Sequence, residues 1–594
     1  MKTEVYMADN NIIRLKISKG TGAMLGAAFG DALGWPNERI AKSNASKQTQ
    51  GRLHDFRRWT RRSGGRFFPH DEIIEEGEYS DDTQLILCLS RSLQKGEAWW
   101  EHFTQVELPF WSVYERGGGG ATKRAVESWL DGVMPWSSNR KPQDVKRYYD
   151  AGGNGVAMRV LPHVLFLGEK EFPKIATNIF LDGIATHGHP RALLGALAYG
   201  FALWVAFRKD SKLAYGELVE ELIKNVDLWS ALPATPSIPS EWQSQAEKYL
   251  QDYMKLWGAA KAELMGYLEV CRAELSKGAL ILDDDVLKKL QCFSTKISGA
   301  GTVAAIASVF LASRYAVDPI NGVVRAAFAI GSDTDTIASM TGGLLGCING
   351  SDWLSPVKQG IQDAAYIEKN AFRLANGHID DKPTHEVVKR SLLKNWIDDV
   401  VIAPDSSEVS LPDCRKAKVN RGRDYIGRSG KFKVEFRRLT TEDGQIIYLN
   451  KISKGDFEPI ASSPKQTSVP HQQPISKSRG CGSKIPVASF EKAIWFYRDC
   501  LGLTVKKQSE DVVVFDQGLV LVPLSYTNNV PQGIQLRAML YIQATNIAER
   551  FRWIKESDLQ VVTALAPWGK SGMLFFRSLD PDGNVVEVFS ADGQ

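Results

Sequence analysis

Hydrophobic positions recur at helical spacing over most of the chain. Between about residues 20 and 391, apolar side chains return every three or four positions or fill runs of buried-helix composition. Glycine clusters at 117–120, 152–155 and 299–301 interrupt these runs. The pattern predicts an all-α domain over residues 18–395, with its chemistry on glycine-rich connections. The expected helices include residues 83–93, 191–207, 245–270, 302–315 and 335–345.

The pattern changes after about residue 395. Segments 432–438 and 445–450 flank a short turn and predict a β-hairpin, so residues 396–460 are expected to form a β-containing connector. Residues 461–480 are polar and rich in proline and serine, which is typical of a flexible linker.

The remainder of the chain, residues 481–594, repeats one order of elements twice. A strand, a helix and three short strands are expected in each half, which predicts a domain of paired βαβββ units. The fold class is therefore multidomain: an all-α domain, a small β-rich connector and an α+β domain. The expected elements are strand 482–487, helix 490–500, strands 503–508, 512–515 and 519–523, then strand 538–543, helix 547–555 and strands 559–565, 573–579 and 585–590.

Bulk composition indicates a soluble globular protein. Hydrophobic residues make up 43% and charged residues 24%, and the net charge of +4 does not require a nucleic-acid partner. The seven cysteines are scattered without a CxxC pair, which argues against a disulfide framework and against structural zinc. The N-terminus lacks a signal-peptide pattern, and the long uncharged runs 192–207 and 297–313 are shorter than the roughly 20 residues that span a bilayer. These features predict a cytoplasmic protein that does not cross a membrane.

Two carboxylate clusters lie far apart in the sequence. They are Ser80-Asp81-Asp82-Thr83 and Asp333-Thr334-Asp335-Thr336, each at an expected helix start. Helix capping is the simpler interpretation, but capping needs only one carboxylate, and adjacent carboxylates repel one another unless a cation lies between them. Sets of oxygen ligands suit Mg²⁺, Mn²⁺ or Ca²⁺. Two converging helix N-termini would therefore form the two halves of one metal site.

Five segments carry a resemblance to a known family. They are 26–38 (GAAFGDALGWPNE), Ser80–Thr83, 152–162 (GGNGVAMRVLP), Thr186-His187 and 331–338 (GSDTDTIA). Their order and spacing resemble those of ADP-ribosylglycohydrolases of the dinitrogenase reductase-activating type, over about residues 20–360. The resemblance implies an all-α fold with two Mg²⁺ (or Mn²⁺) ions in a cleft. The implied metal ligands are Ser80, Asp81, Asp82, Asp333, Asp335 and Thr336.

The resemblance also implies roles around the metals. Glu38 would lie near the metals and the substrate as a ligand or acid/base group, and Glu38 and Asp82 are the expected catalytic residues. Asp31 is expected to be a buried structural acceptor. Cleavage at C1″ of ADP-ribose passes through an oxocarbenium-like state. Metal ions can hold the ribose hydroxyls and activate water, while a carboxylate moves protons. A glycine-rich loop before a helix can hold a pyrophosphate. The expected substrate-binding residues are Gly153, Asn154, Gly155, Met158, Arg159, His187 and Ser332.

The C-terminal module has its own resemblance. Segments 490–503 (FEKAIWFYRDCLGL) and 579–589 (LDPDGNVVEVF) resemble the vicinal oxygen chelate superfamily, which includes glyoxalase I and bleomycin-resistance proteins. Glu587 matches the last metal ligand of that superfamily, but the expected strands 482–487 and 538–543 offer no histidine or glutamate. Because one carboxylate does not hold a catalytic metal, a binding or scaffolding role is favoured over glyoxalase activity. A dimer formed through this domain is compatible with the resemblance.

The leading hypothesis is a metal-dependent hydrolase that removes ADP-ribose from a modified target, fused to a module that binds a ligand or partner. Two other hypotheses stay open: a non-catalytic ADP-ribose-binding protein, and a small-molecule binding or resistance protein acting through the C-terminal domain. The residues do not identify the ADP-ribosylated acceptor, which could be a protein side chain, a small molecule or a nucleic acid.

Overall fold

The computed structural model describes two compact units, Met1–Ile460 and Ala461–Gln594, which are treated separately below. The described residues are 2–38, 54–211, 213–233, 238–278, 281–380, 386–422, 424–427, 429–457, 481–487, 505–508, 512–515, 519–523, 539–543, 547–556, 561–567, 574–579 and 585–590.

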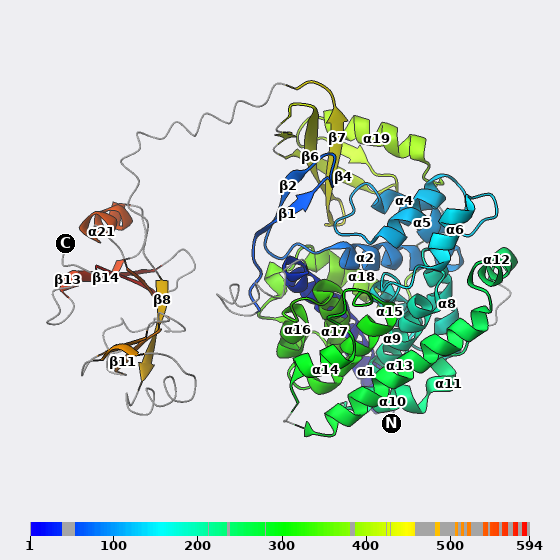
Figure 1. The fold of residues 1–594 in the computed structure, drawn as a ribbon, viewed down its shortest axis with the longest axis horizontal. Helices are drawn as coiled ribbons and strands as arrows, with labels where there is room; N and C mark the ends of the chain where they lie inside the picture. The colour runs from blue at the N-terminus through cyan, green and yellow to red at the C-terminus, as the bar shows by residue number, and fades with distance from the viewer. Residues whose placement is uncertain are drawn as a thin grey trace. The chain divides into compact units, whose positions relative to one another are not determined.

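Helices form most of the first unit, as the periodicity predicts (Figure 1). The helices are α1 (Lys2–Gly34), α2 (Asp81–Leu93), α3 (Trp99–His102), α4 (Leu108–Trp111), α5 (Gly120–Leu130), α6 (Pro142–Tyr149), α7 (Leu161–Leu167), α8 (Phe172–Ile184), α9 (Pro190–Arg208), α10 (Glu217–Lys224), α11 (Val226–Trp229), α12 (Ser240–Leu250), α13 (Tyr253–Leu275), α14 (Asp283–Lys289), α15 (Gly301–Arg314), α16 (Pro319–Ala327), α17 (Thr334–Asn349), α18 (Ala364–Ala375) and α19 (Arg390–Ile402).

One expected helix is divided. The prediction of a continuous helix over 245–270 is wrong, because α12 ends at Leu250 and α13 begins at Tyr253. Gln251 and Asp252 between them have φ of 46° and 65°, which a helix cannot contain. The Asp252 side chain then accepts from Lys255 N–H at 3.0 Å and caps α13.

Helices α1 and α17 touch backbone to backbone at the centre of the unit. Glycines at every fourth position of α1 fall on one helix face. A Cβ at any of them would lie only 2.0 to 2.3 Å from a carbonyl oxygen of α17 or of the residue that follows it. The facing pairs are Gly22 with Gly350, Gly26 with Gly342, Gly30 with Ala338, and Gly34 with Thr334. This contact fixes the end of α1 against the start of α17.

Helix α9 is a core helix. By length and composition it could cross a membrane, but 83% of its apolar window is buried inside the protein. It packs against α8, α13 and α15, so its apolar surface is covered by neighbouring helices.

Strands cover one end of the first unit. A two-stranded ribbon, β1 (Trp59–Ser63) and β2 (His70–Ile74), interrupts the helical region, and the sequence pattern gave no sign of it. The predicted hairpin at 432–450 is confirmed as the antiparallel pair β6–β7. The connector sheet has the order β3-β4-β6-β5, with β7 also paired to β6. Its strands are β3 (Glu408–Ser410), β4 (Lys416–Arg421), β5 (Tyr425–Ile426), β6 (Phe432–Thr441) and β7 (Ile446–Lys454).

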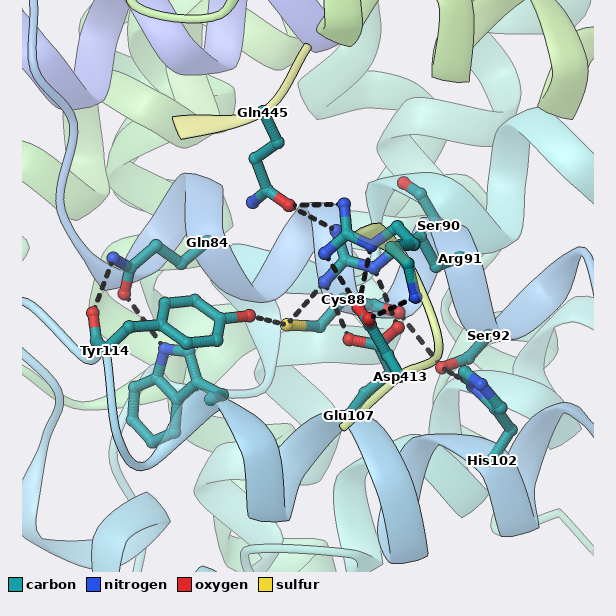
Figure 2. Close-up of polar contacts among 12 residues, drawn as sticks. Gln84, Cys88, Ser90, Arg91, Ser92, His102, Glu107, Tyr114, Asp413 and Gln445 are labelled. Atoms are coloured by element: carbon teal, nitrogen blue, oxygen red, sulfur yellow. Dashed lines mark hydrogen bonds and ion pairs between the residues drawn. The ribbon is translucent and has the colours of Figure 1, made fainter. Parts of the chain in front are cut away.

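A buried polar network joins this sheet to the helices. The Arg91 guanidinium, near the C-terminal end of α2, donates to Glu107 at 2.7 and 2.6 Å and to Gln445 Oε1 at 3.2 Å (Figure 2). Arg415, beside β4, donates to the same Gln445 oxygen at 2.8 Å. Because α19 also runs across the expected boundary at 395/396, the sheet and the helices share one compact unit.

The second unit contains an eight-stranded sheet of the predicted kind. Its order is β13-β14-β15-β12-β8-β11-β10-β9, with β8 parallel to β11 and β12 parallel to β15. Helix α21 (Ile547–Glu556) packs on β13 and β14. The expected helix at 490–500 and the expected linker at 461–480 lie outside the described residues. The strands are β8 (Cys481–Val487), β9 (Val505–Gln508), β10 (Val513–Phe515), β11 (Leu519–Pro523), β12 (Met539–Gln543), β13 (Val561–Pro567), β14 (Leu574–Leu579) and β15 (Val585–Phe589).

Candidate active site

Asp31 of α1 holds the start of α2. The Asp31 carboxylate accepts from Ser80 N–H at 3.0 Å, from Thr83 N–H at 2.9 Å and from the Thr83 hydroxyl at 2.6 Å. These contacts confirm the expected role of Asp31 as a buried acceptor. Ser80 is the N-cap of α2 and accepts from Asp82 N–H at 3.4 Å. With the backbone donors satisfied in this way, the carboxylates of Asp81 and Asp82 are not needed for capping.

The second cluster begins α17. Asp333 occupies the N-cap position, but its side chain makes no capping hydrogen bond. Asp333 Oδ2 instead accepts from Asn154 Nδ2 at 2.9 Å. This use of an N-cap aspartate is unusual for a purely structural residue, since capping is what the position favours.

The two clusters meet, as the sequence predicts. The Thr336 hydroxyl donates to Asp82 Oδ2 at 3.3 Å across a separation of 254 residues. Burial raises the pKa of Asp82, and the charges of Asp31, Asp81 and Asp333 raise it further. Burial likewise raises the pKa of Asp335, followed by the charges of Glu38, Asp333 and Asp82.

Glu38 lies next to both clusters. It follows the short 3₁₀ helix η1 (Trp35–Asn37), which continues from α1. Its charge contributes to the raised pKa of Asp335, and also to that of Asp81 after the larger effects of burial, Glu115 and Asp31. The site is therefore a partly enclosed group of mutually repelling carboxylates.

The donor chemistry of this group suits a hard cation. Asp82 Oδ1 is buried and has no hydrogen-bond partner among the described residues. A buried acceptor without a partner lowers the stability of the fold unless another group or an ion binds to it. As the described side chains stand, no three histidine, cysteine, aspartate or glutamate residues are grouped closely enough to hold an ion, so an ion bound here would have to draw the carboxylates of the two clusters closer together. The hydroxyls of Ser80 and Thr336 are further oxygen donors beside those carboxylates.

Two residues at the site were not found from the sequence. Glu115 is the largest charged contributor to the raised pKa of Asp81. Gly117 has φ of +112°, and a Cβ there would lie 2.8 Å from Asp81 Oδ1. The glycine run 117–120 was visible in the sequence, but nothing in it indicated which carboxylate it would face.

The loop predicted to bind substrate lies beside Asp333. Asn154 N–H donates to Gly299 O at 2.9 Å and Gly301 N–H donates to Gly152 O at 3.1 Å, so the two glycine-rich connections form a short bridge. A cavity of about 390 Å³ lies against this bridge. Its lining includes Gly152, Gly153, His189, Arg191, Lys296 and Gly299.

The other expected substrate-binding residues are largely buried. Arg159, in the 3₁₀ helix η5 (Ala157–Arg159), is 0% exposed and its guanidinium donates to Asp182, Gly155 and Thr186. Met158 and His187 are buried close to it. The Ser332 hydroxyl is buried before Asp333 with no hydrogen-bond partner among the described residues. The structure thus gathers Asn154, Gly155 and His187 around one loop and places Arg159 behind it.

The Glu587 carboxylate in the second unit is paired with an arginine side chain of the same unit. It lies on β15 opposite Arg577 of β14, and Arg577 Nε donates to Glu587 Oε2 at 3.0 Å. The two side chains are 2% and 0% exposed. Its carboxylate is therefore engaged in a buried ion pair.

The family model for ADP-ribosylglycohydrolases matches residues 14–384, more than half of the chain. The chain belongs to the ADP-ribosylglycohydrolase family. Residues 481–588 of this glycohydrolase-family chain match the Glyoxalase/Bleomycin resistance protein/Dioxygenase superfamily.

Similar proteins include uncharacterized protein YegU of Escherichia coli (strain K12), which is 24% identical over 358 residues, 59% of this chain and 93% of YegU. The ADP-ribosylarginine hydrolase Tri1 of Serratia proteamaculans (strain 568) is 24% identical over 32% of this chain, a match that spans only 47% of Tri1. Among solved structures, an ADP-ribosylglycohydrolase-related protein complex is 20% identical with a TM-score of 0.38, covering 62% of this chain and 100% of that one.

Proposed function

We propose that this chain is a metal-dependent hydrolase that removes ADP-ribose from a modified target by cleaving its C1″ glycosidic bond. The observation that carries the proposal is the meeting of the two clusters, with the Thr336 hydroxyl on Asp82. Helix capping is local to each helix, so it does not explain why buried carboxylates at the starts of two distant helices lie next to each other. Family membership and the hydrolase named among its relatives point the same way.

Two Mg²⁺ or Mn²⁺ ions would be held by the oxygens of Ser80, Asp81, Asp82, Asp333, Asp335 and Thr336. When bound, such ions polarise sugar oxygens and lower the pKa of coordinated water. Burial and, after it, mutual repulsion raise the pKa values of Asp81, Asp82 and Asp335, and ion binding would relieve the repulsion.

The residues of the chain would share the remaining tasks. Asp31 holds the N-terminus of α2, so Asp81 and Asp82 keep their place when the charge in the site changes. Asn154 orients Asp333 through a hydrogen bond and ties the glycine-rich loop to α17. Glu38 would hold and move a proton at the scissile oxygen or at the attacking water. The cavity beside Gly153 would receive the part of ADP-ribose remote from the scissile bond.

Arginine is the first acceptor to test, because Tri1 is named an ADP-ribosylarginine hydrolase. The free buried cysteines Cys88, Cys271, Cys292 and Cys347 support a reducing compartment, so we place the reaction in the cytoplasm. We assign the C-terminal module to binding a ligand, a partner or a second copy, since Glu587 is paired with Arg577.

The deciding experiment incubates the full-length protein with arginine-, serine- and nucleic-acid-linked ADP-ribose, each with Mg²⁺, Mn²⁺ or a chelator, and measures free ADP-ribose. We expect metal-dependent release that Asp335→Asn reduces by at least about 100-fold with little change in thermal stability, because one ligand charge is lost and no core volume is removed. Asp352→Asn, on an exposed aspartate, is the matched control. Full activity of Asp335→Asn would contradict the two-cluster site. Tight ADP-ribose binding without release from any substrate would instead favour the non-catalytic alternative.

A further inference from the structure

A chain of hydrogen bonds runs behind the glycine-rich loop to His187. Arg159 Nη2 donates to Thr186 Oγ1 at 2.9 Å, and Thr186 Oγ1 lies 2.8 Å from His187 Nδ1. All three side chains are buried. The contacts by themselves do not show which of Oγ1 and Nδ1 is the donor.

The direction of the second bond follows from the first. A guanidinium only donates, so the Thr186 oxygen is the acceptor from Arg159. Arg159 is held in this pose by Asp182, whose carboxylate accepts from Nε at 2.9 Å and whose carbonyl accepts from Nη2 at 2.9 Å. The hydrogen of the Thr186 hydroxyl then has one acceptor among the described residues, His187 Nδ1. The reverse arrangement, with Nδ1–H donating, would leave that hydroxyl hydrogen without an acceptor in a buried place.

An Nδ1 atom that accepts a hydrogen bond is unprotonated, so the ring proton of neutral His187 is on Nε2. Nε2 faces the glycine-rich loop: a Cβ added to Gly155 would lie 3.4 Å from it, and one added to Gly153 would lie 3.8 Å away. Asn154, between those glycines, is the residue that binds Asp333. Within the described part of the chain, Nε2 makes no hydrogen bond.

We propose that Arg159 and Thr186 are positioning residues that fix His187 as the neutral Nε2–H tautomer, so that it presents one hydrogen-bond donor to an oxygen of bound ADP-ribose. The identity of the ligand rests on the function proposed above, whereas the tautomer does not. His187 then orients substrate and does not transfer protons. Arg159, which is predicted from the sequence to bind substrate, acts instead through Thr186 and His187.

The surroundings of His187 agree with a neutral ring. The charged groups that act on it are Arg159, Asp182 and Arg124, of which two are cationic. Burial first, and then the charge of Arg159, lower the pKa of His187 to about 3. Asp182 opposes this shift, but its carboxylate is engaged by Arg159 and lies 3.6 Å from the ring of His163.

The tautomer can be read in the full-length protein without any assay of activity. The chain is labelled with ¹⁵N on its nine histidines, and the His187 signals are assigned by their loss in His187→Gln. We expect a neutral ring with the proton on Nε2 that does not change between pH 5 and pH 8. A proton on Nδ1, or a titration within that range, would overturn the proposal.

Variants of Thr186 test the relay itself. Thr186→Val keeps the shape and removes the hydroxyl, so we expect Nδ1-protonated His187 to appear and ADP-ribose to bind about tenfold more weakly, the value of roughly one hydrogen bond. Thr186→Ser should restore both the tautomer and the affinity. Thr104→Val, which removes another buried hydroxyl that donates to Trp100 O at 2.9 Å, is the matched control and should change neither.

The outcomes separate this inference from the proposed function. An unchanged tautomer and affinity in Thr186→Val would overturn the role of Thr186. If the wild-type chain does not bind ADP-ribose at all, the proposed function and the ligand named here are contradicted, while the spectrum of the protein alone still confirms or overturns the fixed tautomer.

Discussion

Glu38 lies close enough to both carboxylate clusters for its charge to act on a residue of each. It lies at the end of the α1–η1 segment, is half-buried, and its charge raises the pKa of both Asp81 and Asp335, after burial in each case. A carboxylate beside the two proposed groups of metal ligands can either hold an ion or carry a proton. A substitution that keeps size and polarity but removes the charge distinguishes these roles.

Glu38→Gln is expected to lower kcat by about 100-fold or more while changing the Kd for free ADP-ribose by less than about threefold, because the amide cannot carry the proton. Steady-state kinetics beside titration with ADP-ribose measures both. Glu76→Gln, an exposed glutamate close in sequence to the first cluster, is the control. Equal losses in kcat and affinity would reassign Glu38 to positioning the substrate or the metals.

Much of the residue-scale picture could be predicted because the signals are local. The SDDT cluster has two adjacent carboxylates and the DTDT cluster has two that are separated by one residue, and helix capping explains only one carboxylate in each. Contacts between distant segments gave no such signal: the bond from Asn154 to Asp333 spans 179 residues, and Glu115 reaches Asp81 from a loop with no motif. Arg159 matched a family motif, yet only its packing shows that the guanidinium is buried and bound to Asp182, Gly155 and Thr186.

At the scale of elements, the α1–α17 contact places the two halves of the site. Helix α1 carries Asp31 and leads to Glu38, while α17 begins at Thr334, and both helices need glycine at the crossing to approach so closely. The spacing of glycines 22, 26, 30 and 34 is visible in the sequence, as is that of 342, 346 and 350. The spacing indicates that each helix has a close partner but does not say that they are partners of each other.

Gly30→Ala is expected to lower the free energy of unfolding by about 1–3 kcal/mol or more and to reduce activity, because the added methyl group would lie 2.1 Å from Ala338 O and force α1 away from α17. Thermal and denaturant unfolding measure the change. Gly266→Ala on α13, where an added Cβ meets nothing within 4 Å, is the control. That control should be neutral or stabilising by up to about 1 kcal/mol. Equal stability of both variants would mean that α1 and α17 do not cross at these glycines.

Strands and helices were predicted best where the hydrophobic pattern was long and regular. The β6–β7 hairpin and the repeated order in the second unit follow alternation that a pleated sheet imposes. The break at Gln251–Asp252 was missed because apolar spacing continues through it. The β1–β2 ribbon was missed because its alternation is of charged residues, with the side chain of Arg61 largely buried on Glu72 and that of Arg62 exposed.

At the scale of the whole molecule, the helical domain and the connector sheet depend on each other. Arg91 and Glu107 form a buried ion pair, and Arg91 also donates to Gln445 of the connector, to Tyr366 of α18 and to Cys88 Sγ. Ile446 N–H also donates to the Asp363 carboxylate at 3.0 Å, and the guanidinium carbon of Arg116 lies 4.2 Å from the centre of the Tyr448 ring. Since these partners belong to one compact unit, the connector is expected to be part of the same domain as the candidate site.

Two truncations test this dependence. A chain ending at residue 460 should keep its thermal stability and its hydrolase activity on small substrates, because the break lies between the compact units. A chain ending at residue 395 should be insoluble or much less stable, since it cuts α19 and removes Gln445 and Arg415 from the Arg91 network. Size-exclusion chromatography and thermal unfolding compare the two. A soluble and active 1–395 chain would show that the sheet is dispensable.

The second unit should not be a glyoxalase, because its one matching carboxylate already has a buried partner. Arg577 and Glu587 face each other across β14 and β15 at 3.0 Å. In a fragment spanning residues 461–594, Glu587→Gln is expected to leave the affinity for Ni²⁺ and Zn²⁺ unchanged, and the fragment should not process hemithioacetals. Arg577→Met should destabilise the fragment by about 3–5 kcal/mol, because it removes the cation that faces the buried Glu587 carboxylate, and Glu587→Leu added to it should recover most of that loss. Titration calorimetry and denaturant unfolding measure these effects. Stoichiometric metal that is lost in Glu587→Gln, together with turnover of a hemithioacetal, would show instead that the ion pair opens and that the chain carries two enzymes.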